Sequence, residues 1–411
     1  MATEHTPPPF HELPRAGRIA RIVERLESLG RTDAETLVSR ATIGLNLPTS
    51  QDADGNARIL AQYADPKDAT LGIHVPLGFV PDVLVNGKPR WIPIASEEPC
   101  VISATRSGAR RASADGGFEV AGFRQAILTG QVALFEIPDP AAAKAAVERE
   151  QAALLAVADA VVAGFKCRGG GAMRVRLEPT RDPKLHVAAV DIDCVDAMGA
   201  TKVTQAAEAL AERLAELTGG RVGACILTND APERIMHVHC RFRETSFDAD
   251  AGRAADIAQG IVDASRFAAA CPRRAATHNK GIMNGLSGVV LATGNDTRAA
   301  EAAAHAFAAT FDGGYGPLSR WTRAGGWVEG SLGIPVVLGA VGGATRINPT
   351  AQLSMALAGE PNGRELAMLA AVAGMACHFT AMRFLATRGI GERHGAGQAR
   401  AAAISSPAAK R

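Results

Sequence analysis

The stretch of the sequence with the most evident chemistry covers residues 275–296 and reads AATHNKGIMNGLSGVVLATGND. A polar cluster opens it, Gly-Asn-Asp closes it, and the Val-Val-Leu-Ala run between them is expected to form a short strand. If 274–284 is helical, four polar side chains share an arc of roughly 120°. These are Arg274, Thr277, Lys280 and Asn284. Their guanidinium, hydroxyl, ammonium and amide suit an anionic, oxygen-rich small molecule, although a solvated helix face would show the same spacing.

Carboxylates stand at the ends of two expected strands. Asp296 precedes an alanine-rich helix, so it is either a helix N-cap or a carboxylate at a strand end, where ligand sites collect. Glu97 and Glu98 follow a second apolar strand, and because adjacent residues of an extended chain point to opposite sides, at most one faces a given cleft. A carboxyl buried there would have a raised pKa and could act as a general acid. A solvated strand end is the alternative.

A third candidate is the turn Asp-Ala-Met-Gly-Ala at 196–200, between a strand and a helix. Small residues at this turn would let a phosphate or ribose approach the free N–H groups at the start of the helix. The chain has no G-x-G-x-x-G, so an ordinary Rossmann fingerprint is absent, and a simple helix start would also explain the turn.

Composition excludes several classes of function. The seven cysteines have no C-x-x-C spacing, which favours a reduced cytoplasmic protein, and His237 and His239 lack a third ligand at metal-site spacing. The net charge is only +2, without a long basic run, so no nucleic-acid partner is expected. The longest apolar run, 366–377, is too short to span a bilayer, and the N-terminus lacks the apolar region of a signal peptide.

The periodicity of apolar residues predicts an α/β fold of the α+β type. An amphipathic helix is expected over 10–30, and a β-hairpin with Asn86-Gly87 at its tip is expected further on. Strands and helices in the order β-α-β-β-α-β follow from 129 to 229, including one long alanine-rich helix over 140–165. This order is that of the split-βαβ, ferredoxin-like pattern.

Together these motifs resemble those of one family, the class II hydroxymethylglutaryl-CoA reductases. The matching segments lie between about residue 10 and about residue 400. In order they read VPLGFVPDVLVNGKPRWIPIASEEPC, DAMGA, RAATHNKGIMNGLSGVVLATGNDTRA, VGGATRINPTAQLS and ATRGIGERHG. The resemblance implies that 3-hydroxy-3-methylglutaryl-CoA (HMG-CoA) takes two hydrides from two NAD(P)H molecules to give mevalonate and CoA, or that the reverse reaction runs.

The resemblance also implies an architecture. A large mixed α/β domain that binds the CoA ester would comprise 1–124 and 231–388, and an inserted ferredoxin-like NAD(P)-binding domain would comprise 125–230. A short C-terminal flap, 389–411, would close over an active site built across a homodimer interface.

Roles carry over at matching positions. Lys280 would stabilise the oxyanion, Asp296 would orient Lys280, and Glu98 would protonate the reduced carbonyl. His394, in the flap, would protonate the departing CoA thiolate. The substrate-contacting positions are Cys100, Arg274, Thr277 and Asn284. The nucleotide-contacting positions are Asp196, Met198, Gly199 and Asn229. The resemblance implies no metal.

Two departures from the family keep other functions open. The family's Glu-Asn-Val-Ile-Gly motif is here Asp-Ala-Thr-Leu-Gly at 68–72, and only a short tail follows His394. These departures favour a non-catalytic homologue that binds CoA. A third possibility is a reductase of another acyl-CoA, and the intact Arg274 face would then favour a substrate with a distal carboxylate.

The choice of nucleotide is open on the same grounds. Family members that use NADH carry an aspartate where this chain has Val162, although Asp159 is close in sequence. Lys166 and Arg168 could meet a 2′-phosphate, so NADPH is expected slightly ahead of NADH.

Overall fold

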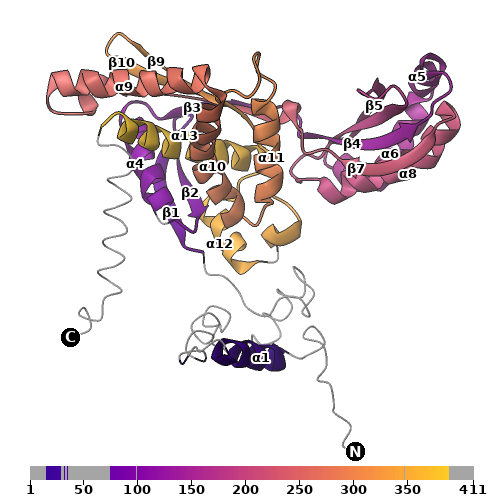
Figure 1. Cartoon of the computed structure of the whole chain (residues 1–411), viewed down its shortest axis with the longest axis horizontal. Coiled ribbons are helices and arrows are strands. Elements are labelled where there is room, and N and C mark those ends of the chain that lie inside the picture. Colours follow the sequence, from indigo (N-terminus) through magenta and orange to yellow (C-terminus); the bar gives the residue numbers. More distant parts are fainter. Residues whose placement is uncertain are drawn as a thin grey trace, which may run out of the picture. The chain divides into compact units, whose positions relative to one another are not determined.

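The computed structural model describes residues 15–28, 32, 35, 75–98, 100–346 and 348–387. The chain divides into two units, Met1–Pro76 and Leu77–Arg411. In the first unit, helix α1 (Arg15–Ser28) lies within the predicted amphipathic helix. The second unit contains two β-sheets and the helices that cover them (Figure 1).

The first sheet has six strands in the order β2-β1-β3-β8-β10-β9. Its strands are β1 (Leu77–Val85), β2 (Lys88–Ala95), β3 (Phe118–Gly122), β8 (Ile235–Arg243), β9 (Ser319–Ala324) and β10 (Trp327–Pro335). The predicted hairpin joins β1 to β2, and Asn86 and Gly87 have φ values of 49° and 73°, as a two-residue turn of this kind requires. Among the strand pairs of this sheet, the short β1–β3 pair is parallel and the others are antiparallel.

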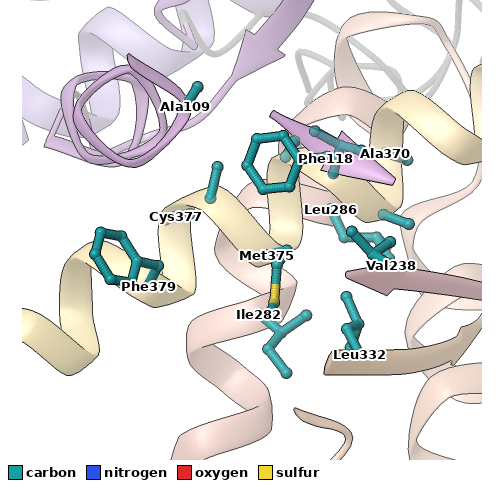
Figure 2. Packing of buried hydrophobic residues seen from close by; sticks show 14 of the residues in the cluster. Ala109, Phe118, Val238, Ile282, Leu286, Leu332, Ala370, Met375, Cys377 and Phe379 are labelled. Carbon is teal, nitrogen blue, oxygen red and sulfur yellow. The ribbon is translucent and has the colours of Figure 1, made fainter. Parts of the chain in front are cut away.

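Helices cover one face of this sheet. They are α4 (Cys100–Ala114), α9 (Ala251–Ala270), α10 (Pro272–Ala292), α11 (Thr297–Ala308), α12 (Pro349–Leu357) and α13 (Gly363–Leu385). From Met236 onward, strand β8 alternates between buried and exposed residues, so a single face meets the core. Figure 2 shows Val238 and Leu332 of the sheet beside Ile282 of α10 and Met375 of α13.

The second sheet has the order β5-β6-β4-β7, and all its neighbouring strands are antiparallel. Its strands are β4 (Ile127–Phe135), β5 (Gly171–Pro179), β6 (Leu185–Asp193) and β7 (Arg221–Leu227), and its helices are α5 (Pro140–Arg149), α6 (Gln151–Val161), α7 (Ala163–Lys166) and α8 (Ala200–Thr218). In chain order this is the predicted β-α-β-β-α-β pattern of a ferredoxin-like unit. The domain boundaries at 124/125 and 230/231 stay a prediction.

One helix in this unit differs from the prediction. The chain over 140–165 forms three consecutive helices because it bends at Glu150 and Val162, whose ψ angles are 10° and 28°. Just after the first bend, the side-chain amide of Gln151 accepts a hydrogen bond from the Val175 N–H and donates one to the Val175 carbonyl. These bonds fasten α6 to β5, which a straight helix from α5 would not allow.

The short strand expected over Val-Val-Leu-Ala was wrong, because α10 continues as a helix to Ala292. Glycines on α10 let it lie directly on its neighbours. A Cβ added to Gly285 would lie 2.2 Å from the carbonyl oxygen of Ala373 in α13, and one added to Gly288 would lie 2.7 Å from Ile94 in β2. Tertiary packing of the whole helix therefore overrides the strand preference of two adjacent valines.

The described residues include one helix, α13, that is long and apolar enough to cross a membrane. Of its most apolar window, 83% is buried inside the protein. It packs against α10, α4 and α9, which is what a central core helix does.

The close α10–α13 contact yields a stability prediction. Replacing Gly285 with alanine forces the two backbones apart and should lower the free energy of unfolding by about 3 kcal/mol in urea titrations. Gly164→Ala is the matched control, because an added Cβ there meets nothing within 4 Å. The control should be neutral or stabilising by up to about 1 kcal/mol. Equal stability of the two variants would contradict this account of the packing.

Candidate active site

The polar face expected on α10 is present. Lys280 and Thr277 are exposed and Arg274 and Asn284 are half-buried, while the opposite side of the helix is packed in the core. Lys280 makes no hydrogen bond or ion pair with any part of the chain that the structure describes. Burial lowers the pKa of Arg274, which nonetheless keeps its charge. The face therefore presents two cations near a hydroxyl and an amide.

Two residues of the same motif, His278 and Asn279, point inward. Both are fully buried. The Asn279 amide donates to the carbonyl of Gly316 and to the Tyr315 hydroxyl, and its oxygen accepts from the Leu318 N–H. Asn279 thus fixes the rotation of α10, and with it the outward direction of its neighbour Lys280.

His278 belongs to a buried histidine pair that the sequence did not reveal. Its Nε2 lies 2.8 Å from the Ser319 hydroxyl and 3.1 Å from Nε2 of His378 in α13. Burial, followed by the positive charge of Arg274, lowers the pKa of His278 to about 4. Burial and the neighbouring His278 lower the pKa of His378 as well. Both rings are therefore neutral near pH 7, beneath the polar face of α10.

Glu98, in the turn between β2 and α4, lies beside Cys100, the first residue of α4. The Cys100 thiol donates to the Glu98 carboxylate over 2.7 Å, and the Glu98 N–H donates to the Ser96 hydroxyl. The end of β2 lies against α10, since a Cβ on Gly288 would come within 3.3 Å of the Ala95 carbonyl oxygen. The turn that carries Glu98 therefore begins at the surface of α10.

Asp296 is the N-cap of α11. Its Oδ1 accepts from the backbone N–H groups of Arg298 and Ala299, and the Arg298 side chain also binds it. Burial would raise the pKa of Asp296, but the hydrogen bonds from Arg298 and the helix backbone outweigh this and lower it. Asp296 is therefore ionised. No ion pair joins it to Lys280, both of which the structure describes.

The Gly-Asn-Asp motif and the Asp-Ala-Met-Gly turn meet at Gly339. Asn295 binds Gly339 through both its amide nitrogen and its oxygen, at 3.0 and 2.8 Å. The other side of Gly339 lies against the turn, since an added Cβ would be 2.2 Å from the backbone nitrogen of Met198. The Ala340 N–H also donates to the carbonyl of Asp196. Two motifs about a hundred positions apart in the sequence are thus joined through one residue.

The turn itself leads from β6 into α8, as expected. The N-cap of α8 is Gly199, which has a φ of 96°. Because glycine has no side chain, it cannot cap the first N–H groups of α8. The Asp196 carboxylate accepts from the Gly363 N–H at the start of α13. Asn229 lies half-buried in the bend after β7. Asp196, Met198 and Gly199 thus share the turn before α8, and Asn229 lies just beyond the end of β7, the strand that follows α8.

The residues considered for nucleotide choice lie between the last turn of α6 and the residues just after α7. Val162 is buried, so its side chain faces the core of the ferredoxin-like unit. Asp159 pairs with Lys166 and accepts from the Ala172 N–H. Arg168 is exposed, with its guanidinium 5.7 Å from the centre of the Phe165 ring. Of these charged side chains, Arg168 is the one that forms no ion pair with a described residue.

His394 and the Asp-Ala-Thr-Leu-Gly motif at 68–72 lie outside the described residues. His237 and His239 are exposed on β8, and the described residues contain no group of three side chains suited to a metal.

Solved structures place this arrangement in one class of enzyme. The class II 3-hydroxy-3-methylglutaryl-CoA reductase of Streptococcus pneumoniae, bound to NADPH in open conformations, superposes with a TM-score of 0.77 and 32% identity. The match covers 84% of this chain and 100% of that chain. A second structure of the same Streptococcus pneumoniae enzyme covers 89% of this chain, also with a TM-score of 0.77.

The chain belongs to the hydroxymethylglutaryl-coenzyme A reductase family, whose model matches residues 70–399. It is 39% identical over 324 residues to the 3-hydroxy-3-methylglutaryl-coenzyme A reductase of Archaeoglobus fulgidus, a match that covers 78% of this chain and 72% of the relative. A probable enzyme of the same name from Borreliella burgdorferi is 30% identical over 333 residues. The protein is therefore an oxidoreductase, as the resemblance implied.

The buried histidine pair generates a prediction for pH. Unfolded histidine takes up a proton near pH 6.5, whereas folded His278 resists protonation down to about pH 4. The unfolded state then binds more protons in this window, so stability is full above pH 6.5 and falls as the pH drops. Urea titrations should show a loss on the order of 3 kcal/mol by pH 4 from His278.

The control separates this pair from other histidines. A variant carrying His278→Asn and His378→Asn should be less stable at pH 7.5 but should lose less on acidification. Replacing the exposed His237 and His239 by asparagine should leave the wild-type dependence intact. An unchanged slope in the His278/His378 variant would rule the pair out as its source.

Proposed function

We propose that this protein is a hydroxymethylglutaryl-CoA reductase that interconverts HMG-CoA and mevalonate plus CoA with two NAD(P)H molecules. Family membership supports the reaction class. The observation that carries the proposal is the junction at Gly339, which joins the segment bearing Asp296 to the turn expected to bind the nucleotide. A hydride transfer needs its donor next to the groups that stabilise the reacting carbonyl.

The start of α8 fits a nucleotide diphosphate. Its first N–H groups receive no side-chain cap, and its positive end attracts anions. A hollow of about 390 Å³ begins beside it and runs along α8, lined by Ala200, Thr201, Thr204, Gln205, Glu208 and Leu227. The residues that would hold the nucleotide are Asp196, Met198, Gly199 and Asn229. When bound, the reduced nicotinamide supplies the hydride.

NADPH is the favoured nucleotide in this proposal. The Streptococcus pneumoniae relative binds NADPH. Arg168 is exposed near the glycine turn at 169–171, and Gly170 packs against the backbone of Asp193, just before the nucleotide turn. A cation in this position can meet a 2′-phosphate, while the carboxylate of Asp159 is already paired with Lys166.

Each catalytic role follows from the chemistry of the side chain. Lys280, whose ammonium has no described partner, would stabilise the negative oxygen that develops on the carbonyl. Asp296, held ionised by its low pKa, would orient that ammonium. Glu98 would protonate the reduced carbonyl, and its contact with Cys100 holds its carboxyl in one orientation. His394 would protonate the CoA thiolate.

Substrate and assembly complete the proposal. Arg274, Thr277 and Asn284 would bind the distal carboxylate of the substrate through charge-assisted hydrogen bonds, and Cys100 would also contact the substrate. The polar face of α10 that carries Lys280 is exposed to solvent, so a second copy of the chain could cover it and complete the site in a homodimer. A reduced cytoplasmic setting fits the seven cysteines, which have no C-x-x-C spacing, and the proposal includes no metal and no nucleic-acid partner.

The direct experiment follows nicotinamide absorbance with purified protein, HMG-CoA and either nucleotide, in both directions. Turnover with HMG-CoA, faster with NADPH than with NADH, is expected. Turnover with another carboxylate-bearing acyl-CoA in a thioester panel would assign a different substrate. Tight binding of HMG-CoA without turnover in either direction would identify a non-catalytic homologue and end the proposal.

Lys280→Ala should reduce kcat by at least about 100-fold, because it removes the positive charge that stabilises the oxyanion. Circular dichroism should show an unchanged fold, since the side chain is exposed. Lys144→Ala, an exposed lysine on α5, is the control and should retain full activity. Comparable kcat in the two variants would remove Lys280 from the mechanism.

Asp296 has a capping role and a proposed catalytic role, and two substitutions separate them. Asn is also a good N-cap, so Asp296→Asn should keep the melting temperature while reducing kcat by at least about 10-fold through loss of the charge. Asp296→Ala should lose activity and, in addition, about 1 kcal/mol of stability. Full activity of the asparagine variant would leave Asp296 with the structural role alone.

A further inference from the structure

Arg234 is a fully buried arginine that no proposed step uses. It ends a short 3₁₀ helix (Pro232–Arg234) between β7 and β8, and it is the bulkiest fully buried side chain among the described residues. Arginine is almost never fully buried without partners, so the groups around its guanidinium must compensate for its lost hydration.

The guanidinium donates to backbone carbonyls from three segments. Its Nε binds the carbonyl of Ile127 at 2.9 Å, and its Nη2 binds those of Ala126 at 2.7 Å and Met198 at 3.2 Å. A longer contact of 3.5 Å runs from Nη1 to Leu338. One side chain thus connects the start of β4, the nucleotide turn and the residue next to Gly339.

The nucleotide turn needs such support, because its backbone is strained. Val195 has a φ of 55°, a left-handed conformation that costs a β-branched residue about 1–2 kcal/mol. The Asp193 carboxylate accepts from the N–H groups of both Val195 and Ala126. The turn is therefore held from Asp193 on one side and from Arg234 on the other, as a strained functional turn must be.

The charge of Arg234 matters as much as its hydrogen bonds. No carboxylate of a described residue pairs with it within 4.0 Å, so its charge is balanced by carbonyl dipoles, by the neighbouring Cys194 side chain and by the more distant Asp193. Held against the Met198 carbonyl, just before α8, this cation adds to the positive potential of the helix start in a poorly screened interior.

We propose that Arg234 is a positioning residue for the nucleotide site: it fixes the 196–200 turn, with the strained Val195 before it, against Ala126 and Leu338 and adds positive potential where the diphosphate binds. This inference rests on the proposed reductase function, because it assumes that the turn binds NAD(P)H. Arg234 touches neither substrate nor cofactor in it.

The test compares Arg234→Met and Arg234→Lys in the full-length protein. Steady-state kinetics gives separate KM values for nucleotide and HMG-CoA, and NADPH fluorescence gives the nucleotide Kd. Arg234→Met should raise the nucleotide KM and Kd at least 10-fold and change the KM of HMG-CoA less than 3-fold. Arg234→Lys keeps the charge but not the fork of donors, so it should recover part of the loss.

Arg111→Met controls for the general loss of an arginine bonded to a backbone carbonyl, since Arg111 binds Ser246. It should leave both KM values near wild type. If Arg234→Met is insoluble, Arg234→Lys decides, with an expected increase of at least 3-fold in the nucleotide KM alone.

The outcomes distinguish the two proposals. Wild-type turnover combined with unchanged nucleotide affinity in both Arg234 variants, or with equal shifts in both KM values, overturns this inference and leaves the reductase function standing. A wild-type protein that binds neither nucleotide overturns both.

Discussion

The candidate site depends on how closely α10 can approach α13. Glycine at position 285 lets the α10 backbone rest on the Ala373 carbonyl, and Gly281 leaves room for the His378 ring. This contact buries one side of α10 completely and leaves the other side to Arg274 and Lys280. If larger side chains replaced these glycines, α10 would lie further from α13 and would lose the contacts that set its rotation.

The residues of the Thr-His-Asn-Lys and Gly-Asn-Asp motifs divide into two groups with different roles. His278, Asn279 and Asn295 are anchors: their side chains bind other parts of the fold. Lys280, one position from Asn279, is left open. Adjacent positions on a helix differ by about 100° in direction, so an inward-bonded asparagine beside an outward lysine is enough to aim the lysine. The polar run in this motif therefore combines orientation with chemistry.

Local patterns predicted much of the fold. The hairpin at Asn86-Gly87 and the β-α-β-β-α-β order depend on turn chemistry and periodicity within short windows, and both are present. The expected strand at the end of α10 failed because packing against Ile94 and Ala373 decides that segment, and these partners are distant in sequence. The break after α5 likewise depends on the Gln151 bond to β5.

The site was predicted less completely, for the same reason. Resemblance suggested Lys280, Asp296 and Glu98 as site residues, and their catalytic roles stay predictions. The place of Asp296 before an alanine-rich helix allowed an N-cap as one interpretation, and the N-cap is confirmed. Neither the His278–His378 pair nor the contacts of Arg234 with Ala126, Ile127 and Leu338 leave a signal in the sequence, because each joins residues about a hundred positions apart. Such contacts become visible only once the chain is folded.

The place of Arg234 also has a consequence for the order in which the chain acquires its structure. Strands β3 and β8 pair in the first sheet, yet the entire ferredoxin-like unit lies between them in sequence. An unfolded segment of that length makes their pairing entropically costly, whereas a folded one holds its two ends together at Ala126 and Arg234. A folded insert would therefore shorten the loop that β3–β8 pairing has to close. Damage inside it would delay β3–β8 pairing and expose unpaired strand edges to aggregation.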